Sequence, residues 1–273
     1  MAQAPDEPPV LAEVADGVMT VTLNRPGRGN GWNGEVARAY FGLLEDAARS
    51  PEVRAIVLTG AGKSFCIGGD GQKLDEATSS GNVKSTAQRA YWFPLQVGKP
   101  IIGAINGACF GIGLQQALCC DIRIAADDAK FSTAYARRGL VAEMGMSWLL
   151  PRIVGTGNAM DMLLSARLVR AEEARDIGLV NRVVAADALV AEARAYARQL
   201  AEQCSPRSMQ AVKRQCYRDL MGSLFESYER SVDMLDDAVL QEDFREGIRS
   251  WQENRAPAFP PLPEDLALID LEK

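Results

Sequence analysis

Two glycine-rich turns, each placed directly after an apolar strand-like run, constrain the fold of this chain more than any other feature. The runs over residues 55–59 and 100–105 precede the turns at 62–70 and 106–113, and the second turn opens into a helix-like run at 114–118. Glycine lets a backbone turn sharply and approach a ligand closely, and free N–H groups at a helix start attract negative charge. Two such turns brought together would direct two N–H donors at one oxygen, which is the geometry of an oxyanion hole.

The order of strand, turn and helix along the chain predicts an α/β core with largely parallel strand pairing. A polar stretch at 71–86 is expected to form a mobile loop over the site. From about residue 156 helices dominate, and Ser205 with Pro206 is a good cap and first helical residue. We expect the charged helical stretch 224–254 to fold back or to pack on a neighbouring subunit. The expected strands are 10–14, 18–23, 54–59, 101–105 and 121–125, and the other expected helices are 34–49, 86–97, 187–203 and 207–220.

The composition is that of a globular protein, with 47% apolar and 24% charged residues among 273. We expect a tail at 1–9, an α/β core at 10–200 and a C-terminal helical region at 201–273. The formal net charge of −6 argues against a nucleic-acid binder, whose affinity depends on basic residues. No apolar run reaches transmembrane length and no signal peptide is evident, so we expect no membrane partner. Six cysteines without a spacing framework indicate reduced thiols in a cytoplasmic protein.

The chain contains no histidine. Ser-His-Asp and Cys-His catalysis are therefore excluded in their usual forms, as is any histidine-ligated metal site. Proton transfer must use Asp, Glu, Tyr, Lys, Cys or water. We expect neither a metal nor a separate cofactor.

Several segments in order resemble the crotonase superfamily, the enoyl-CoA hydratase/isomerase family. The segments that carry the likeness are residues 23–26, 60–70, 99–125, 131–132, 139–141, 171–174 and 178–180. The resemblance implies a crotonase-like spiral of ββα units, with a C-terminal helical region that assembles homotrimers, which often pair into hexamers. It also implies an acyl-CoA substrate, with coenzyme A as part of that substrate. Matched position by position, it places the two oxyanion-hole N–H donors at Ile67 and Ile112.

The glutamates that hold water in the family's hydratases are missing from this chain. Gln115 and Tyr135 stand at the matching positions. Glutamine can orient water and tyrosine can relay a proton, but neither is a good base at neutral pH. Family members that move double bonds resemble the segment 139–148 and carry a catalytic acid where Glu143 stands. Its apolar flanks would raise its pKa and suit it to proton transfer. The alternative is a structural Glu143, which caps the following helix or pairs with a nearby arginine (Arg137 or Arg138).

These residues are compatible with several reactions. A single carboxylate suffices for a double-bond shift through an enolate, whereas hydration also requires that Gln115 or Tyr135 position a water for Glu143. An acyl-CoA thioester hydrolase and a non-catalytic acyl-CoA-binding protein are the competing functions. Arg28 and Lys63 are candidate contacts for the CoA phosphates, although isolated surface charges are equally compatible with them. Aromatic residues at 91–93 could line an acyl pocket, but such residues on a helix face are usually core.

Overall fold

Six strands form the larger of two sheets in the computed structural model of the chain, which describes residues 7–71 and 89–271. In spatial order they are β1 (Val10–Ala15), β2 (Val18–Leu23), β3 (Ala55–Gly60), β5 (Ile101–Ile105), β7 (Ile122–Ala126) and β10 (Arg182–Val184). β1 and β2 are antiparallel, and every later neighbouring pair is parallel. All residues of β3 and β5 are buried, as expected of parallel strands covered on both faces.

The smaller sheet contains the strands that follow the larger sheet's inner strands along the chain. Its order is β4 (Ser64–Cys66), β6 (Ala108–Phe110), β8 (Lys130–Ser132) and β9 (Val169–Arg170). β3, β5 and β7 thus each lead through a short turn into β4, β6 and β8, and these small strands are mutually parallel. The predicted spiral of repeated strand pairs is confirmed.

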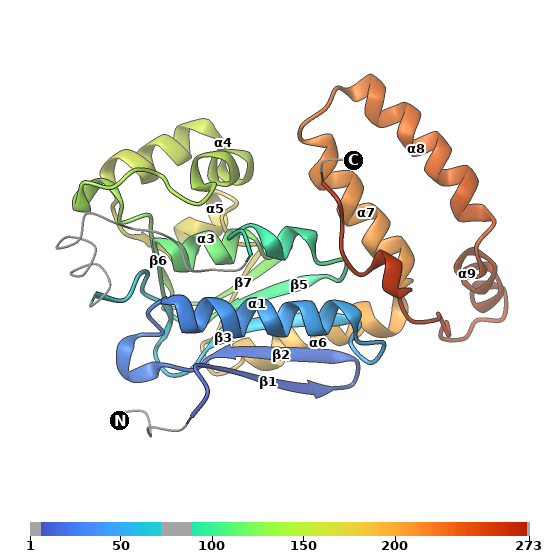
Figure 1. Cartoon of the computed structure of the whole chain (residues 1–273), viewed down its shortest axis with the longest axis horizontal. Helices are drawn as coiled ribbons and strands as arrows, with labels where there is room; N and C mark the ends of the chain where they lie inside the picture. The colour runs from blue at the N-terminus through green and yellow to red at the C-terminus, as the bar shows by residue number, and fades with distance from the viewer. Residues whose placement is uncertain (1–6, 72–88, 272–273) are drawn as a thin grey trace.

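Helices surround the sheets and then extend beyond them. α1 (Gly34–Arg49) begins where the Asn33 side chain accepts N–H bonds from Glu35 and Val36, and α6 (Leu189–Gln203) packs on β2, β3, β5 and β7. The other α-helices in the described residues are α3 (Ile112–Leu118), α4 (Met146–Ser165), α5 (Ala171–Asp176), α7 (Pro206–Asp219), α8 (Leu224–Val239) and α9 (Glu242–Gln252). Short 3₁₀ helices are η1 (Pro26–Arg28), η2 (Phe93–Gln96), η3 (Ala136–Arg138) and η4 (Glu264–Leu266). Figure 1 shows α7, α8 and α9 standing to one side of the sheets.

One of the sequence-based expectations needs adjustment. The helix expected at 86–97 is only η2 within the described residues, because Val97 forms a bridge with Leu268 and the Gly98 N–H donates to the Ala267 carbonyl. This pairing holds the chain extended after η2 and returns the C-terminal segment to the core. The stretch 224–254 is helical as predicted and forms two helices, α8 and α9. The loop predicted at 71–86 lies outside the described residues apart from its first position.

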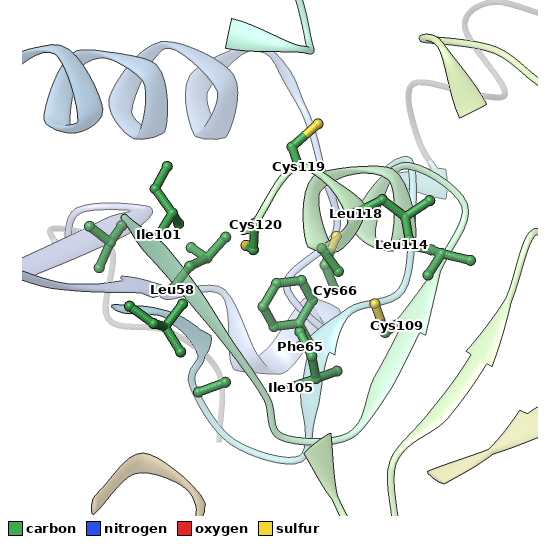
Figure 2. Close-up of a cluster of buried hydrophobic side chains, with 14 of the residues drawn as sticks. Leu58, Phe65, Cys66, Ile101, Ile105, Cys109, Leu114, Leu118, Cys119 and Cys120 are labelled. Atoms are coloured by element: carbon green, nitrogen blue, oxygen red, sulfur yellow. The ribbon is translucent and has the colours of Figure 1, made fainter. Parts of the chain in front are cut away.

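A buried apolar cluster lies beneath the glycine turns. Figure 2 shows Cys66 of β4 and Cys109 of β6 together with Phe65 and Leu114. Burial raises the pKa of the Cys66 thiol to about 12, so this cysteine serves as a small core side chain. The glycine turns therefore pack on a rigid, buried core. No helix in the part of the chain that the structure describes is long and apolar enough to cross a membrane.

Candidate active site

The two glycine turns meet at the ends of β4 and β6. A Cβ atom added to Gly113 would lie 2.3 Å from the Cys66 carbonyl oxygen, and one added to Gly68 would lie 3.3 Å from the Phe110 carbonyl oxygen. Side chains at these positions would push the turns apart. Glycine is therefore required here because two backbones approach closely.

In the first turn, the amide that is free to bind a ligand belongs to Gly69. The Ile67 N–H donates to the Gly29 carbonyl at 3.1 Å, so the predicted donor already has an acceptor. Trp32 donates to the Gly68 carbonyl and accepts from the Asp70 N–H. This pairing directs the Gly69 N–H away from Trp32, to a side where it meets no acceptor within residues 7–71 and 89–271. Ile67 therefore stays a predicted donor whose N–H already has an acceptor, and Gly69, which the sequence reasoning missed, has the free amide of this turn.

In the second turn, Ile112 is the first residue of α3. The first N–H groups of an α-helix lack intrahelical acceptors, and the Ile112 N–H has no partner among the described residues. The left-handed conformation falls on Gly111, with φ of 51°, whereas Ile112 is helical. The branched side chain of Ile112 therefore causes no backbone strain at the predicted donor.

A buried ion pair fixes the first turn. The Arg25 guanidinium lies 2.8 Å from the Asp70 carboxylate, and the two side chains are 14% and 7% exposed. Arg25 also donates to the Gly31 carbonyl at 2.6 Å. Arg28 lies 3.9 Å from the same carboxylate but is 53% exposed, and Lys63 is exposed on the approach to the turn. Their predicted contact with CoA phosphates stays a prediction.

The Gln115 side chain is fully buried and is bonded to the protein. Its amide oxygen accepts from Gln116 Nε2 at 2.6 Å, and its Nε2 lies within hydrogen-bond distance of the Tyr91 carbonyl and the Cys119 sulfur. Gln116 donates to the same Tyr91 carbonyl at 2.8 Å. Gln115 is thus poorly placed to hold a reacting water.

Tyr135 and Glu143 lie on the other side of the turns. A Cβ atom on Gly111 would be 4.0 Å from the Tyr135 ring, so this ring packs beside the second turn. The Tyr135 hydroxyl is buried and has no hydrogen-bond partner among the described residues. A buried hydroxyl without a partner is costly, and such costs are tolerated mainly where a ligand or a reaction uses the group.

Glu143 follows η3 in a tight turn before α4. It is half-buried, and neither structural alternative holds: α4 begins at Gly145 without a side-chain cap, and no described arginine pairs with Glu143. The next residue, Met144, has a left-handed backbone with φ of 55°, which is uncommon outside glycine and often marks functional sites.

The electrostatics of this pair suit proton transfer. Burial raises the pKa of the Glu143 carboxyl above its usual 4.5. Burial, and then the negative charge of Glu143, raise the pKa of Tyr135, so the phenol stays protonated. The site thus combines a carboxylate of increased basicity with a neutral hydrogen-bond donor.

Gly145, which follows Glu143 by two residues in the chain, lines a cavity of about 680 Å³. Its walls come from the segment around η2, the start of α4, the end of α7, α8 and Leu271. They include Gly145, Trp92 and Trp148, together with Leu95, Leu149, Tyr217, Arg218, Met221, Gly222, Glu226 and Arg230. The size is typical of a small-molecule pocket.

The glycine pair Gly68-Gly69 is a sequence signal for a free amide at Gly69. N–H groups alternate in direction along a strand-like segment. The N–H groups of Ile67 and Gly69 would therefore point to the same side only in a regular segment. Gly68, with φ of 103°, breaks that regularity. A glycine pair at 68–69 marks such a break, but only the pairing with Trp32 identifies the free amide.

Comparison with known proteins adds independent evidence. Residues 13–261 match the enoyl-CoA hydratase/isomerase family. The chain is 34% identical to the 1,2-epoxyphenylacetyl-CoA isomerase of Escherichia coli over 92% of this chain and 97% of that protein. It is 38% identical to the (E)-benzylidenesuccinyl-CoA hydratase of Thauera aromatica, over 92% and 98%. A crystal structure of a probable enoyl-CoA hydratase/isomerase from Mycobacterium abscessus superposes with a TM-score of 0.86 at 30% identity, covering 93% and 99%.

Proposed function

Because the chain belongs to the enoyl-CoA hydratase/isomerase family and is an enzyme of CoA thioesters, we propose that it shifts a carbon–carbon double bond of an enoyl-CoA. The observation that carries this proposal is the single half-buried carboxylate, Glu143, without a partner among the described residues. Its charge acts on Tyr135, whose ring packs beside the second glycine turn. We propose no cofactor beyond the coenzyme A of the substrate.

The thioester carbonyl oxygen would lie between the N–H groups of Gly69 and Ile112. Both amides lack acceptors among the described residues, and the turns that carry them are in contact. When a proton leaves the carbon next to the carbonyl, negative charge develops on this oxygen. Preorganised backbone donors stabilise that charge without further rearrangement.

Glu143 would act as base and then as acid. Its carboxylate takes a proton from C2 of a 3-enoyl-CoA, and the electron pair of the broken C–H bond delocalises into a dienolate. The resulting carboxylic acid returns the proton to C4, so the double bond moves to C2–C3 and Glu143 is regenerated. No proton, electron or water is consumed overall. The raised pKa of Glu143 makes it the stronger base for the first step.

The arrangement of Gln115 favours this shift over hydration. Hydration requires a held water as well as a base, and the Gln115 side chain is already occupied by Gln116, Tyr91 and Cys119. Tyr135 offers a protonated hydroxyl beside Glu143. In this proposal the hydroxyl donates to the dienolate or to the carboxylate and keeps Glu143 oriented. One of the two relatives named above is an isomerase and the other a hydratase, so their names alone favour neither reaction.

Substitution of Glu143 tests the proposal. With trans-3-hexenoyl-CoA, the wild-type enzyme should form 2-hexenoyl-CoA, whose conjugated thioester absorbs in the ultraviolet. Glu143→Gln keeps the side-chain shape and should lower kcat by at least about 100-fold, the scale of a lost general base. Hexanoyl-CoA binding should change little.

Product analysis separates the alternatives. Incorporation of ¹⁸O from labelled water into a 3-hydroxyacyl product would indicate hydration, and release of free CoA would indicate hydrolysis. Full activity in Glu143→Gln would refute the assignment of the base. Glu172→Gln, on the exposed surface of α5, is the matched control and should retain wild-type activity.

We also propose that copies of the chain assemble as a homotrimer through α8 and α9. These helices expose large apolar side chains, among them Leu224 (87% exposed), Phe225, Leu235 and Trp251 (77% exposed). Exposed apolar surface of this extent is unusual for a lone globular chain. Sedimentation equilibrium should give the mass of three chains, or of six if trimers pair, whereas the mass of one chain would refute the proposal.

A further inference from the structure

The cavity that Gly145 lines has apolar walls, and one of its two arginines has a guanidinium without a partner among the described residues. Trp92, 37% exposed, and Trp148 contribute indole rings, and Met221 is 59% exposed. The Arg152 guanidinium lies 4.0 Å from the centre of the Trp148 ring. Figure 1 shows α4 on one side and α7 and α8 on the other, and residues of all three helices line the cavity.

The polar and charged side chains that line the cavity differ in whether they already have a partner within the protein. Arg230 lies 2.6 Å from the Asp219 carboxylate. Glu226 accepts from the Ser223 N–H at 2.9 Å and from its hydroxyl at 3.0 Å. The Tyr217 hydroxyl donates to Asp121 at 2.9 Å. Each of these groups therefore already has a partner within the protein.

Arg218 is the exception. It is half-buried at the end of α7, and its guanidinium forms no hydrogen bond or ion pair within residues 7–71 and 89–271. Its charge lowers the pKa of Asp219, but that carboxylate is bound by Ser227 and Arg230. A guanidinium beside apolar walls interacts more strongly with an anion than one in open water, and its planar fork fits a carboxylate.

From this arrangement we infer that the cavity receives the far end of the acyl group and that Arg218 selects acyl groups ending in a carboxylate. The substrate class is then a CoA thioester of a dicarboxylic acid with an apolar middle. This inference rests on the proposed function only in assuming that the acyl chain passes Glu143. The cavity extends from the segment just after Glu143 to Arg218, because Gly145 and Arg218 both line it.

Binding of unreactive thioesters tests the inference without any turnover. Adipoyl-CoA and hexanoyl-CoA have the same chain length and differ in the terminal carboxylate. By titration calorimetry, the wild-type protein should bind adipoyl-CoA the more tightly. Arg218→Met should weaken adipoyl-CoA binding by about 10- to 100-fold, the scale of a charge-assisted hydrogen bond, and leave hexanoyl-CoA within threefold. Arg218→Lys should restore part of the difference.

Arg214→Met is the matched control, because Arg214 lies one helical turn earlier on α7 and does not line the cavity. It should change neither affinity. Equal weakening of both ligands by Arg218→Met would indicate a phosphate contact or a structural role and would overturn the inference, as would a wild type without preference. If the wild-type protein did not convert enoyl-CoA substrates but still bound adipoyl-CoA more tightly than hexanoyl-CoA, the isomerase proposal would be refuted. This inference would still stand.

Discussion

Gly113→Ala tests whether close contact between the two glycine turns creates the oxyanion site. The new Cβ atom would lie 2.3 Å from the Cys66 carbonyl oxygen and 2.7 Å from the Cys66 Cβ atom. Since Cβ atoms essentially never come within 3.0 Å of another atom, the turns must separate by about 0.7 Å or more. Oxyanion donors work over a narrow distance range of about 2.7–3.1 Å, so a shift of this size removes one donor from reach.

The expected consequence is a loss of catalysis that exceeds the loss of stability. Removal of one oxyanion donor lowers kcat by about 100- to 1,000-fold. Overpacking of a rigid interior costs about 1–3 kcal/mol of the free energy of unfolding, which corresponds to a Tm decrease of about 2–12 °C. The variant should therefore stay folded at 25 °C while its activity collapses.

The assay combines kcat for trans-3-hexenoyl-CoA isomerisation with thermal unfolding of the same preparation. Gly42→Ala is the matched control: Gly42 lies inside α1, and a Cβ atom there meets nothing within 4 Å. This control should raise the free energy of unfolding by about 0.5–1 kcal/mol and leave kcat unchanged. A folded Gly113→Ala enzyme with kcat within threefold of wild type would refute the reasoning about the turns.

Three further predictions concern charge. Because burial raises the pKa of Glu143 and the base must be ionised, kcat/KM should fall with decreasing pH through a midpoint above 4.5; a midpoint at or below 4.5 would contradict the buried base. The same raised pKa means that the folded state holds this proton more tightly than the unfolded state, so ionised Glu143 destabilises the fold at neutral pH. Glu143→Gln should then be slightly more stable than wild type at pH 7, with the gain lost as pH falls through the raised pKa. Lys213→Met should lower Tm by about 6–20 °C, because Lys213 lies 2.8 Å from Asp121 with side chains 7% and 18% exposed, and loss of one partner of a buried pair costs about 3–5 kcal/mol; an unchanged Tm in calorimetry would contradict this.

Local patterns in the sequence were sufficient for elements whose stability is local. The helix predicted at 34–49 coincides with α1, since its apolar face repeats with helical period and Asn33 caps it. Ser205 and Pro206 begin α7 as predicted. The helix predicted at 86–97 was wrong in its described part, because Val97 and Gly98 pair with residues about 170 positions later. No local pattern contains that partner.

The candidate site shows the same limit at the scale of single atoms. The glycine pattern predicted two turns but not which amide is free, because the acceptor for Ile67, the Gly29 carbonyl, comes from a different loop. Gln115 was predicted as a group that might orient water, yet its neighbour Gln116 and the Tyr91 carbonyl occupy it. Both outcomes depend on contacts between segments, which residue spacing does not contain.

In the proposed mechanism the backbone stabilises the oxyanion and one side chain transfers the proton. This separation of roles explains how an enzyme of this family can lack both water-holding glutamates. In this proposed mechanism, oxyanion stabilisation comes from backbone amides, so it depends on where the turns lie and survives replacement of nearby side chains. The base is then the only role that needs a particular side chain, and any carboxylate that reaches C2 and C4 of the substrate can fill it. Glu143 lies in a turn whose strained neighbour, Met144, has φ of 55°. Such strain persists only when the surrounding structure imposes it, and the neighbouring Glu143 carboxyl is half-buried, which raises its pKa. With no histidine in the chain and Tyr135 kept protonated, proton transfer converges on one group, and a single group that both removes and returns a proton is suited to isomerisation.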